Sequence, residues 1–274
     1  MCRVTAILSA AKAAHTDLLC EGPRSLLAQG EVAARPQDDG WGIARLDARG
    51  KALLAKSPRP ARLEKPAFRK AAAAPARVVL AHLRDASNPG KLPKTRLVGP
   101  RNTQPFAGEG LLFGHNGTLF IKDEIRSLLG KYAARVKGVN DSEVLFWQVV
   151  KMLDAYGDPA LALEMALDEI RTVWVSCRGK YPGLKAPYRG LNLYLAGPDS
   201  LTVLCHWPGK NKPALLAPGW KFGQVAWRME KGRVVFSSEP SDARPGWRRM
   251  NDSEIAVASV KGGRLQLSFR RIPA

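Results

Sequence analysis

Residues 2–9, Cys-Arg-Val-Thr-Ala-Ile-Leu-Ser, follow directly after Met1. Six of these eight positions hold apolar or β-branched side chains, and a short run of this kind is typical of a buried strand. We therefore predict a first strand over residues 3–9. Cys2 stands immediately before this strand, at the end of the chain where an α-amine can lie next to its thiol.

This position gives Cys2 a chemistry that an internal cysteine lacks. If Met1 is removed, the free α-amine, with a pKa near ~8, can accept the proton of a thiol whose pKa is near ~8.5. One residue then supplies both the nucleophile and its base. A cysteine at position 2 is weak evidence when taken alone, so the hypothesis depends on the rest of the sequence.

Length and composition favour one large domain over residues 2–274. The 274 residues are 45% hydrophobic, which is enough for a sizeable core. No apolar run approaches the ~18 residues that a membrane helix needs, so we expect no membrane segment. The four cysteines show no metal-ligand spacing. We expect no metal and no organic cofactor, and a location in the reducing cytoplasm.

The chain is strongly basic, with a net charge of +19 from 43 Lys and Arg against 24 Asp and Glu. A field of this size attracts nucleic acid or an acidic protein partner. The charge is dispersed, however, with local densities at 56–70, 91–101 and 244–249 and no zinc finger or RNA-binding motif. These observations favour a solvated basic surface over a nucleic-acid interface.

The order of predicted elements is strands, two helices and strands again. Helices are expected from 141 to about 153 and from 158 to about 173, because capping residues precede apolar positions at helical spacing. Strands are expected at 40–46, 77–83, 111–117, 191–196, 201–205, 233–237, 255–260 and 264–269. This order predicts an α+β fold. Residues 88–101 and 177–189 are rich in Gly and Pro and are predicted to be surface loops, the latter a loop or lid.

A series of short motifs follows Cys2 in a fixed order. They are Asp39-Gly40-Trp41-Gly42-Ile43, Ala81-His82-Leu83-Arg84-Asp85-Ala86-Ser87, Asn102-Thr103-Gln104-Pro105-Phe106, Gly114-His115-Asn116-Gly117 and Asn140-Asp141-Ser142-Glu143. Together with the Met1-Cys2-Arg3 start, this order resembles the class II glutamine amidotransferases, especially the stand-alone kind that lacks a synthetase domain. The resemblance is dense over residues 2–146 and returns at 237–240 and 245–248.

This resemblance implies a fold and an activity. The fold is the four-layer α-β-β-α sandwich of the N-terminal-nucleophile hydrolases, with two stacked antiparallel sheets between helix layers. The activity is hydrolysis of the glutamine side-chain amide to glutamate and ammonia through a Cys2 thioester. Because this chain shows no synthetase region, the ammonia is expected to go to a separate synthetase partner.

The matched residues carry roles that suit their chemistry. The Asn116 side-chain amide and the Gly117 backbone N–H are expected to stabilise the tetrahedral oxyanion. Arg84 offers a permanently charged fork to the substrate carboxylate, to which Ser87 adds a hydroxyl. Asp141 is expected to bind the substrate ammonium. Singly, each residue also suits a surface ion pair, a turn or a helix cap, and only the joint pattern favours a site.

Two other functions stay open at this point. The same residues suit a γ-glutamyl peptide or γ-glutamyl amide hydrolase, because the clamp on the glutamyl group leaves the amide nitrogen side free. The +19 charge also suits a catalytically weak basic binding protein on the same scaffold. Gln104, where the family commonly has His, is the departure that raises this second alternative.

Several other residues of the motifs are interpreted as structural. Trp41 and Phe106 are expected to pack around the site, as large aromatic side chains usually do. His82 and His115 are expected to be structural, because the mechanism implied by the resemblance uses the α-amine as base. The His115-Asn116-Gly117 sequence favours a turn at the end of its strand.

Overall fold

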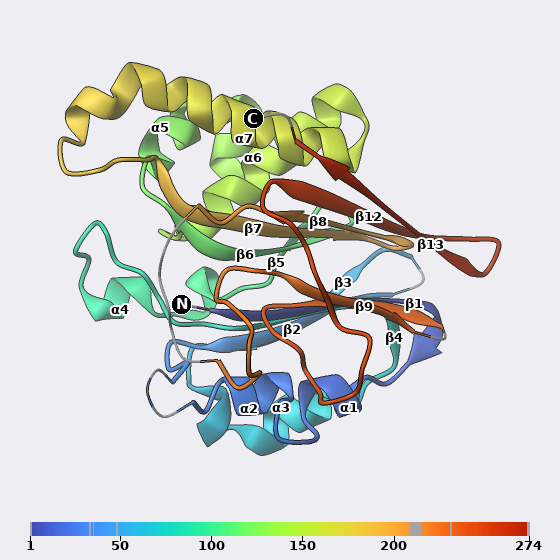
Figure 1. Cartoon of the computed structure of the whole chain (residues 1–274). Helices are drawn as coiled ribbons and strands as arrows, with labels where there is room; N and C mark the ends of the chain where they lie inside the picture. The colour runs from blue at the N-terminus through green and yellow to red at the C-terminus, as the bar shows by residue number, and fades with distance from the viewer. Residues whose placement is uncertain are drawn as a thin grey trace.

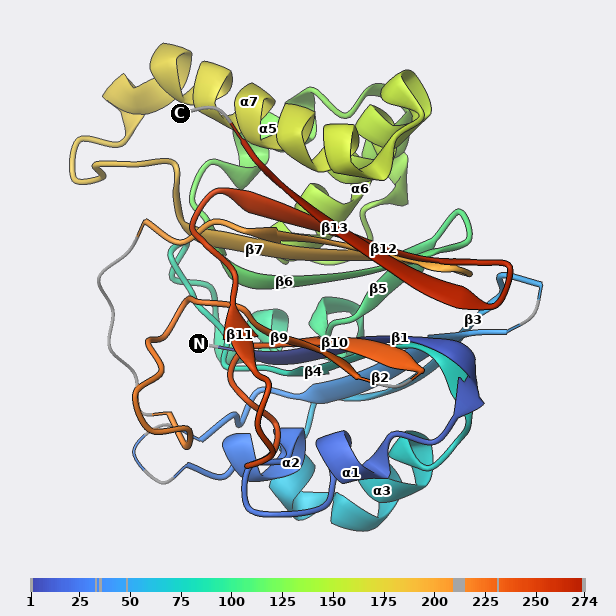
Figure 2. The ribbon, with the colours of Figure 1, turned by 45° about the vertical axis from the view of Figure 1, so that its right-hand side comes forward.

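The computed structural model describes residues 2–32, 34, 36–47, 49–208, 215–230 and 232–272. Two antiparallel sheets are stacked face to face, and a helix layer covers the outer face of each sheet (Figures 1 and 2). The architecture is therefore the expected α-β-β-α sandwich. Met1, whose removal is expected, lies outside the described residues.

The first sheet has seven strands with the amino-terminal strand near its centre. Its order is β11 (Arg248–Arg249), β9 (Ala226–Glu230), β10 (Arg233–Ser237), β1 (Arg3–Ala13), β4 (Ala76–Leu83), β2 (Trp41–Leu46) and β3 (Ala52–Ser57). Antiparallel ladders flank β1 on both sides, with Thr5 opposite Ser237 of β10 and Ala81 of β4. This double pairing fixes the start of β1, and with it the position of Cys2.

The second sheet has six strands. Its order is β13 (Arg264–Arg271), β12 (Glu254–Lys261), β8 (Ser200–Cys205), β7 (Tyr188–Gly197), β6 (Leu111–Leu119) and β5 (Phe106–Gly108). The sheets thus combine strands from both halves of the chain, since β9 and β10 complete the first sheet while β5 and β6 belong to the second.

The helices form the two outer layers. The first sheet is covered by α1 (Thr16–Leu19), α2 (Leu26–Gln29) and α3 (Lys65–Ala72), and the second by α5 (Lys122–Ser127), α6 (Asp141–Tyr156) and α7 (Pro159–Cys177) (Figure 1). The connections contain the short helix α4 (Lys94–Leu97) and 3-10 turns at Ala61–Leu63, Pro100–Asn102, Gly130–Arg135 and Arg178–Lys180. Within the described ranges, no helix is long and apolar enough to cross a membrane.

Three apolar clusters lie between the four layers. The central cluster joins the two sheets and includes Val4 and Leu80 from the first sheet and Tyr194 and Val203 from the second. The outer clusters pack each sheet against its own helices. The alternation of side chains along β1 explains this arrangement, because Val4 enters the central cluster while Ile7 enters an outer one.

Most predicted elements are confirmed, and several of them extend beyond the predicted bounds. The predicted helices correspond to α6 and α7, which begin at the Asn140 and Asp158 caps. The predicted turn at His115-Asn116-Gly117 is wrong, because these residues continue β6 and pair with Leu193, Asn192 and Leu191 of β7. Pairing with a neighbouring strand overrides the local turn preference. The predicted loop at 88–101 contains α4 and the start of a 3-10 turn.

Candidate active site

A cavity of about 540 Å³ lies at the end of the sandwich where β1 begins. The residues that line it include Cys2 before β1, Arg84 after β4, Gly117 in β6 and Asp141 at the start of α6. We call this part of the lining the inner wall. Ser87 lies on the same wall. The fold therefore brings five of the predicted site residues, from four separate segments of the chain, to one cavity.

Cys2 lies on the floor of this cavity and is only 8% exposed. Its Sγ donates a long hydrogen bond, 3.6 Å, to the backbone carbonyl of Asp85. Burial raises the pKa of the Cys2 thiol, although this hydrogen bond and the charge of Arg84 act in the opposite direction. A thiol in this setting needs a base close by to become a nucleophile.

Arg84 presents a buried guanidinium to the cavity. It is 3% exposed, and its Nη1 donates to the backbone carbonyls of Leu97 at 3.1 Å and Asp39 at 3.5 Å. Burial lowers the pKa of Arg84, although the nearby Asp39 and Asp141 carboxylates act against this effect. In the part of the chain that the structure describes, Arg84 forms no ion pair within 4.0 Å, so its charge can pair with an anionic ligand.

The Asp39-Gly40 turn holds the segment that carries Arg84. Arg84 N donates to Gly40 O at 2.8 Å, and Asp39 N donates to Arg84 O at 3.0 Å. The Asp39 carboxylate accepts from Ala86 N at 2.9 Å. Gly40 has a φ of +124° and permits this close approach. The motif therefore shapes the loop of the site, while Trp41 packs against Phe68 in the outer apolar cluster.

Asp141 lies at the amino-terminal end of α6 and faces the cavity. Its Oδ2 accepts a hydrogen bond from Leu119 N at 2.7 Å, which joins the helix to the end of β6. The Asn140 side chain, rather than Asp141, caps the helix by accepting from Ser142 N at 2.9 Å. Asp141 is thus left with one carboxylate oxygen that has only a 3.5 Å contact with Ser142 Oγ.

The expected oxyanion residues occupy neighbouring positions of β6. Gly117 lines the cavity, and the neighbouring Asn116 is 2% exposed, with its Nδ2 3.5 Å from Ser238 Oγ. Gly117 tolerates no side chain, because a Cβ would collide with the Gly190 carbonyl and the His115 ring. This close packing fixes the backbone of the strand at the cavity.

Ser87 is held by a residue that the sequence patterns did not single out. Thr118 Oγ1 donates to Ser87 Oγ at 2.8 Å, and Thr118 also accepts a 3.4 Å contact from the Arg189 guanidinium. Because Thr118 directly follows Gly117, its position next to the His-Asn-Gly motif is the only sequence signal that pointed to it.

Gln104 ties the strand of the site to α6. Its Oε1 accepts from His115 N at 2.6 Å, and its Nε2 donates to His115 O at 3.0 Å. His115 Nδ1 and Ser142 Oγ are 2.9 Å apart. The glutamine therefore satisfies both backbone groups of His115 without a titratable ring.

Both histidines of the motifs are buried. Burial lowers the pKa of His82 to about 3, and its Nε2 lies 3.3 Å from His115 O. Burial also lowers the pKa of His115, whose Nε2 lies 3.3 Å from Gly190 O. Neutral rings with these partners act as structural groups, in agreement with the sequence interpretation.

The segment Ser237–Ser238–Glu239 holds the amino-terminal end of β1. Ser238 Oγ accepts from Val4 N at 2.9 Å, and Ser238 N donates to Val4 O at 2.9 Å. The Glu239 carboxylate lies 3.3 Å from Arg3 Nε, and neither side chain is exposed. The family resemblance includes this segment but implies no role for it, and its contacts place it beside the start of β1 and Asn116.

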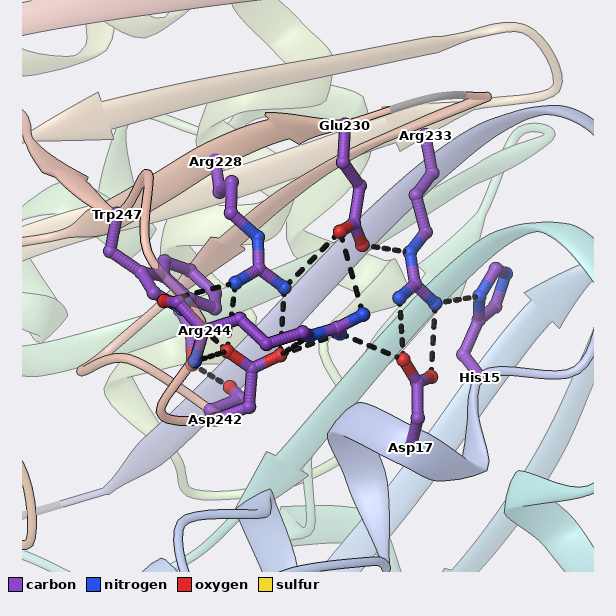
Figure 3. Close-up of polar contacts among 10 residues, drawn as sticks. His15, Asp17, Arg228, Glu230, Arg233, Asp242, Arg244 and Trp247 are labelled. Carbon is purple, nitrogen blue, oxygen red and sulfur yellow. Dashed lines mark hydrogen bonds and ion pairs between the residues drawn. The ribbon is translucent and has the colours of Figure 1, made fainter.

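An ion network anchors the chain that follows Glu239 (Figure 3). Arg228 makes two hydrogen bonds of 2.7 Å to Asp242, and Asp17 of α1 accepts from Arg233 and Arg244. Burial opposes ionisation of Asp242, but its bonds to Arg228 hold its pKa well below its usual range. The network thereby joins α1, β9, β10 and the segment after Ser238 into one rigid support.

Metal ligands are not grouped at this site. Among the described residues, no set of three or more His, Cys, Asp or Glu side chains could hold a metal ion.

Solved structures share this fold. A glutamine aminotransferase class-II domain protein from Silicibacter pomeroyi has a TM-score of 0.67 at 18% identity, with 100% of each chain covered. Glutamine phosphoribosylpyrophosphate amidotransferase from B. subtilis has a TM-score of 0.60 at 15% identity, with 99% of this chain and 49% of that chain covered. The allosteric regulatory enzyme of purine biosynthesis has a TM-score of 0.64 at 16% identity, with 99% of this chain and 49% of that chain covered.

These likenesses establish the N-terminal-nucleophile hydrolase fold, and the chain spans about half the length of the last two proteins. A comparison with curated proteins gives no match. The sequence model of the class II glutamine amidotransferases, however, matches residues 1–178, which is more than half of the chain. The protein therefore belongs to the class II glutamine amidotransferases, a family of amidohydrolases that act on glutamine.

Proposed function

We propose that the protein hydrolyses the side-chain amide of a γ-glutamyl compound, with glutamine as the simplest substrate and Cys2 as nucleophile. The observation that carries this proposal is the convergence of Cys2, Arg84, Gly117 and Asp141 on one cavity. Family membership supports the same reaction.

In this proposal the inner wall binds the amino-acid end of the glutamyl group. The Arg84 guanidinium pairs with the α-carboxylate, and the Ser87 hydroxyl adds a hydrogen bond. Asp141 binds the α-ammonium through the carboxylate oxygen that has only a long contact with Ser142. Opposite charges at two points orient the substrate so that its side-chain amide reaches Cys2.

The chemical steps follow from the N-terminal position of the nucleophile. After Met1 is removed, the Cys2 α-amine takes the thiol proton, and the thiolate attacks the amide carbon. Gly117 N–H and the Asn116 side-chain amide stabilise the oxyanion, and each such donor contributes ~2.7–4 kcal/mol. The C–N bond breaks as the proton passes to the leaving nitrogen. Water then hydrolyses the Cys2 thioester and releases glutamate.

The fate of the nitrogen depends on the substrate. Glutamine gives ammonia, which we propose is passed to a separate synthetase partner in a reducing cytoplasm. A γ-glutamyl peptide or amide gives the corresponding amine, and the size of the cavity favours this second class. We also propose that residues 2–274 act as one domain, because β7–β10, β12 and β13 complete the two sheets that hold Cys2 and Gly117.

The test is product analysis on glutamine with matched variants. We expect glutamate and ammonia in equal amounts, no turnover by Cys2→Ala, and a fall of about 100-fold in kcat/KM for Arg84→Lys, because a lysine cannot replace the guanidinium fork. Arg59→Lys is the control, since the Arg59 side chain is 64% exposed and does not line the cavity. Turnover that persists in Cys2→Ala contradicts the proposal.

A further inference from the structure

The cavity extends well beyond the inner wall. Its volume of about 540 Å³ lies in the ~300–1,000 Å³ range of pockets that hold drug-sized ligands. Of the described residues that line the cavity, the proposed reaction on the glutamyl group uses only Cys2, Arg84, Ser87, Gly117 and Asp141. We call the part of the lining that includes Leu92, Phe120, Lys122, Tyr181 and Leu184 the outer wall. It has no role in the proposed hydrolysis of glutamine itself, so its chemistry bears on the group attached to the amide nitrogen.

Apolar side chains make up much of this outer wall. Leu92 comes from the loop after β4, Phe120 from the link between β6 and α5, and Leu184 from the segment between α7 and β7. All three are partly exposed, so an apolar ligand would remove their surface from water. Burial of such surface contributes about 25 cal/mol per Å², which favours an apolar substituent at this place.

The outer wall is held in place by contacts of its own. Tyr181 Oη donates to Glu124 Oε2 at 2.7 Å, and Lys180 Nζ lies 3.8 Å from the same carboxylate. Phe120 N donates to Pro187 O at 2.8 Å. The 177–189 segment thus lies beside α5, at the end of the sandwich marked N (Figures 1 and 2). A wall fixed in this way can select a substituent by its shape.

One basic side chain lies on the outer wall. Of the described residues that line the cavity, only Arg84 and Lys122 are basic. The Lys122 side chain is 29% exposed, and its ion-pair partner Asp123 is 74% exposed. A pair this exposed is weak, so Lys122 can exchange it for a carboxylate that lies inside the cavity.

We propose that the outer wall binds the leaving part of a γ-glutamyl amino acid with an apolar side chain. Lys122 pairs with the α-carboxylate of that amino acid, and Leu92, Phe120 and Leu184 surround its side chain. This inference rests on the proposed amidohydrolase activity. The reaction consumes one water: the γ-amide C–N bond breaks, glutamate keeps the new C–O bond, and the amino-acid nitrogen takes the proton.

The first experiment compares three substrates on the full chain. They are glutamine, γ-glutamyl-leucine and γ-glutamyl-isoamylamide, which has the leucine side chain without the carboxylate. We expect kcat/KM for γ-glutamyl-leucine to exceed that for glutamine at least tenfold, with the isoamylamide in between. The apolar wall accounts for the increase in kcat/KM from glutamine to the isoamylamide. The Lys122 charge accounts for the further increase from the isoamylamide to γ-glutamyl-leucine.

The second experiment uses ratios within each variant, which do not depend on the amount of folded enzyme. Lys122→Gln is expected to lower the ratio of kcat/KM for γ-glutamyl-leucine to that for the isoamylamide about tenfold. Leu184→Asp is expected to lower the ratio of kcat/KM for the isoamylamide to kcat/KM for glutamine. Lys131→Gln, at a lysine with a 73% exposed side chain outside this cavity, should keep both ratios.

The outcomes separate the inference from the proposed function. If glutamine is hydrolysed through Cys2 but γ-glutamyl-leucine is no better a substrate, or if Lys122→Gln keeps the ratio, the subsite is overturned and the hydrolase stands. If none of the three compounds is cleaved, the proposed function fails and the inference with it.

Discussion

Arg3 and Glu239 form an ion pair in which Arg3 Nε lies 3.3 Å from Glu239 Oε1 and neither side chain is exposed. Glu239 Oε2 also accepts from Leu216 N at 2.7 Å and Ala217 N at 2.9 Å. Burial raises the pKa of Glu239, while the charge of Arg3 lowers it. Since Arg3 directly follows Cys2, the pair joins the residue next to Cys2 to the loop before β9.

Breaking this ion pair is expected to be costly. Arg3→Met or Glu239→Gln leaves one buried charge without its main partner, which lowers the free energy of unfolding by roughly 3–5 kcal/mol. The double variant should lose much less than the sum of the two, because it buries no charge at this place. Urea denaturation of the four proteins measures the coupling. Additive losses would show that the pair does not act as a unit.

Gly117 is expected to tolerate no side chain. Gly117→Ala places a methyl group against the Gly190 carbonyl and the His115 ring, so both stability and glutamine hydrolysis should fall, the former by roughly 1–3 kcal/mol. Gly114→Ala is the control in the same strand, because its Cβ would lie 3.4 Å from the flexible Leu80 side chain. Thermal unfolding and kcat/KM should separate the two variants, and equal effects would refute the steric argument.

Gln104 is expected to matter through the backbone of His115. Gln104→Leu removes the side-chain partner of His115 N and leaves His115 O with His82 Nε2 alone, and a buried N–H left unsatisfied costs roughly 1–3 kcal/mol. Gln266→Leu is the control on an exposed position of β13. The free energy of unfolding, measured by chemical denaturation, and the rate of glutamine turnover should both fall in Gln104→Leu and stay unchanged in Gln266→Leu. A stable and active Gln104→Leu protein would mean that the strand is held by other contacts.

His82 predicts a pH dependence of stability. The unfolded ring takes up a proton near pH ~6.5, whereas burial lowers the pKa of folded His82 to about 3. Between these values the unfolded state holds one more proton, so this residue removes about 1.4 kcal/mol of stability for each unit that the pH falls. Unfolding free energies at several pH values should show a shallower slope for His82→Gln. Identical slopes would mean that His82 is protonated in the folded protein.

Local pattern was sufficient for much of the fold. The apolar run after Cys2 predicted β1, and Asp141-Ser142-Glu143 and Asp158-Pro159 predicted where α6 and α7 begin, although the cap of α6 is Asn140. The pattern failed where a distant partner decides the conformation, as at Asn116, which pairs with Asn192 instead of forming a turn. The short strand β9 was missed for a related reason, because its alternating side chains include Arg228 and Glu230 of the ion network.

The site shows the same division. Cys2, Arg84 and Asp141 could be predicted as site residues from motifs, because their side-chain chemistry suits the proposed reaction. Thr118 and Ser238 could not be assigned a role, since their contacts with Ser87, Val4 and Asn116 arise only when distant segments meet. Thr118 and Ser238 hold the segments that carry the predicted site residues. Contacts of this kind leave little trace in a single sequence.

The account depends most directly on the state of Cys2. The decisive measurement is the intact mass of the purified protein before and after reaction with a diazoketone analogue of glutamine, followed by peptide mapping. We expect a chain without Met1 that takes one label on Cys2, and no label in Cys2→Ala. Retention of Met1, or labelling of Cys20 or Cys205 while Cys2 stays unmodified, would contradict the assignment of Cys2 as the nucleophile.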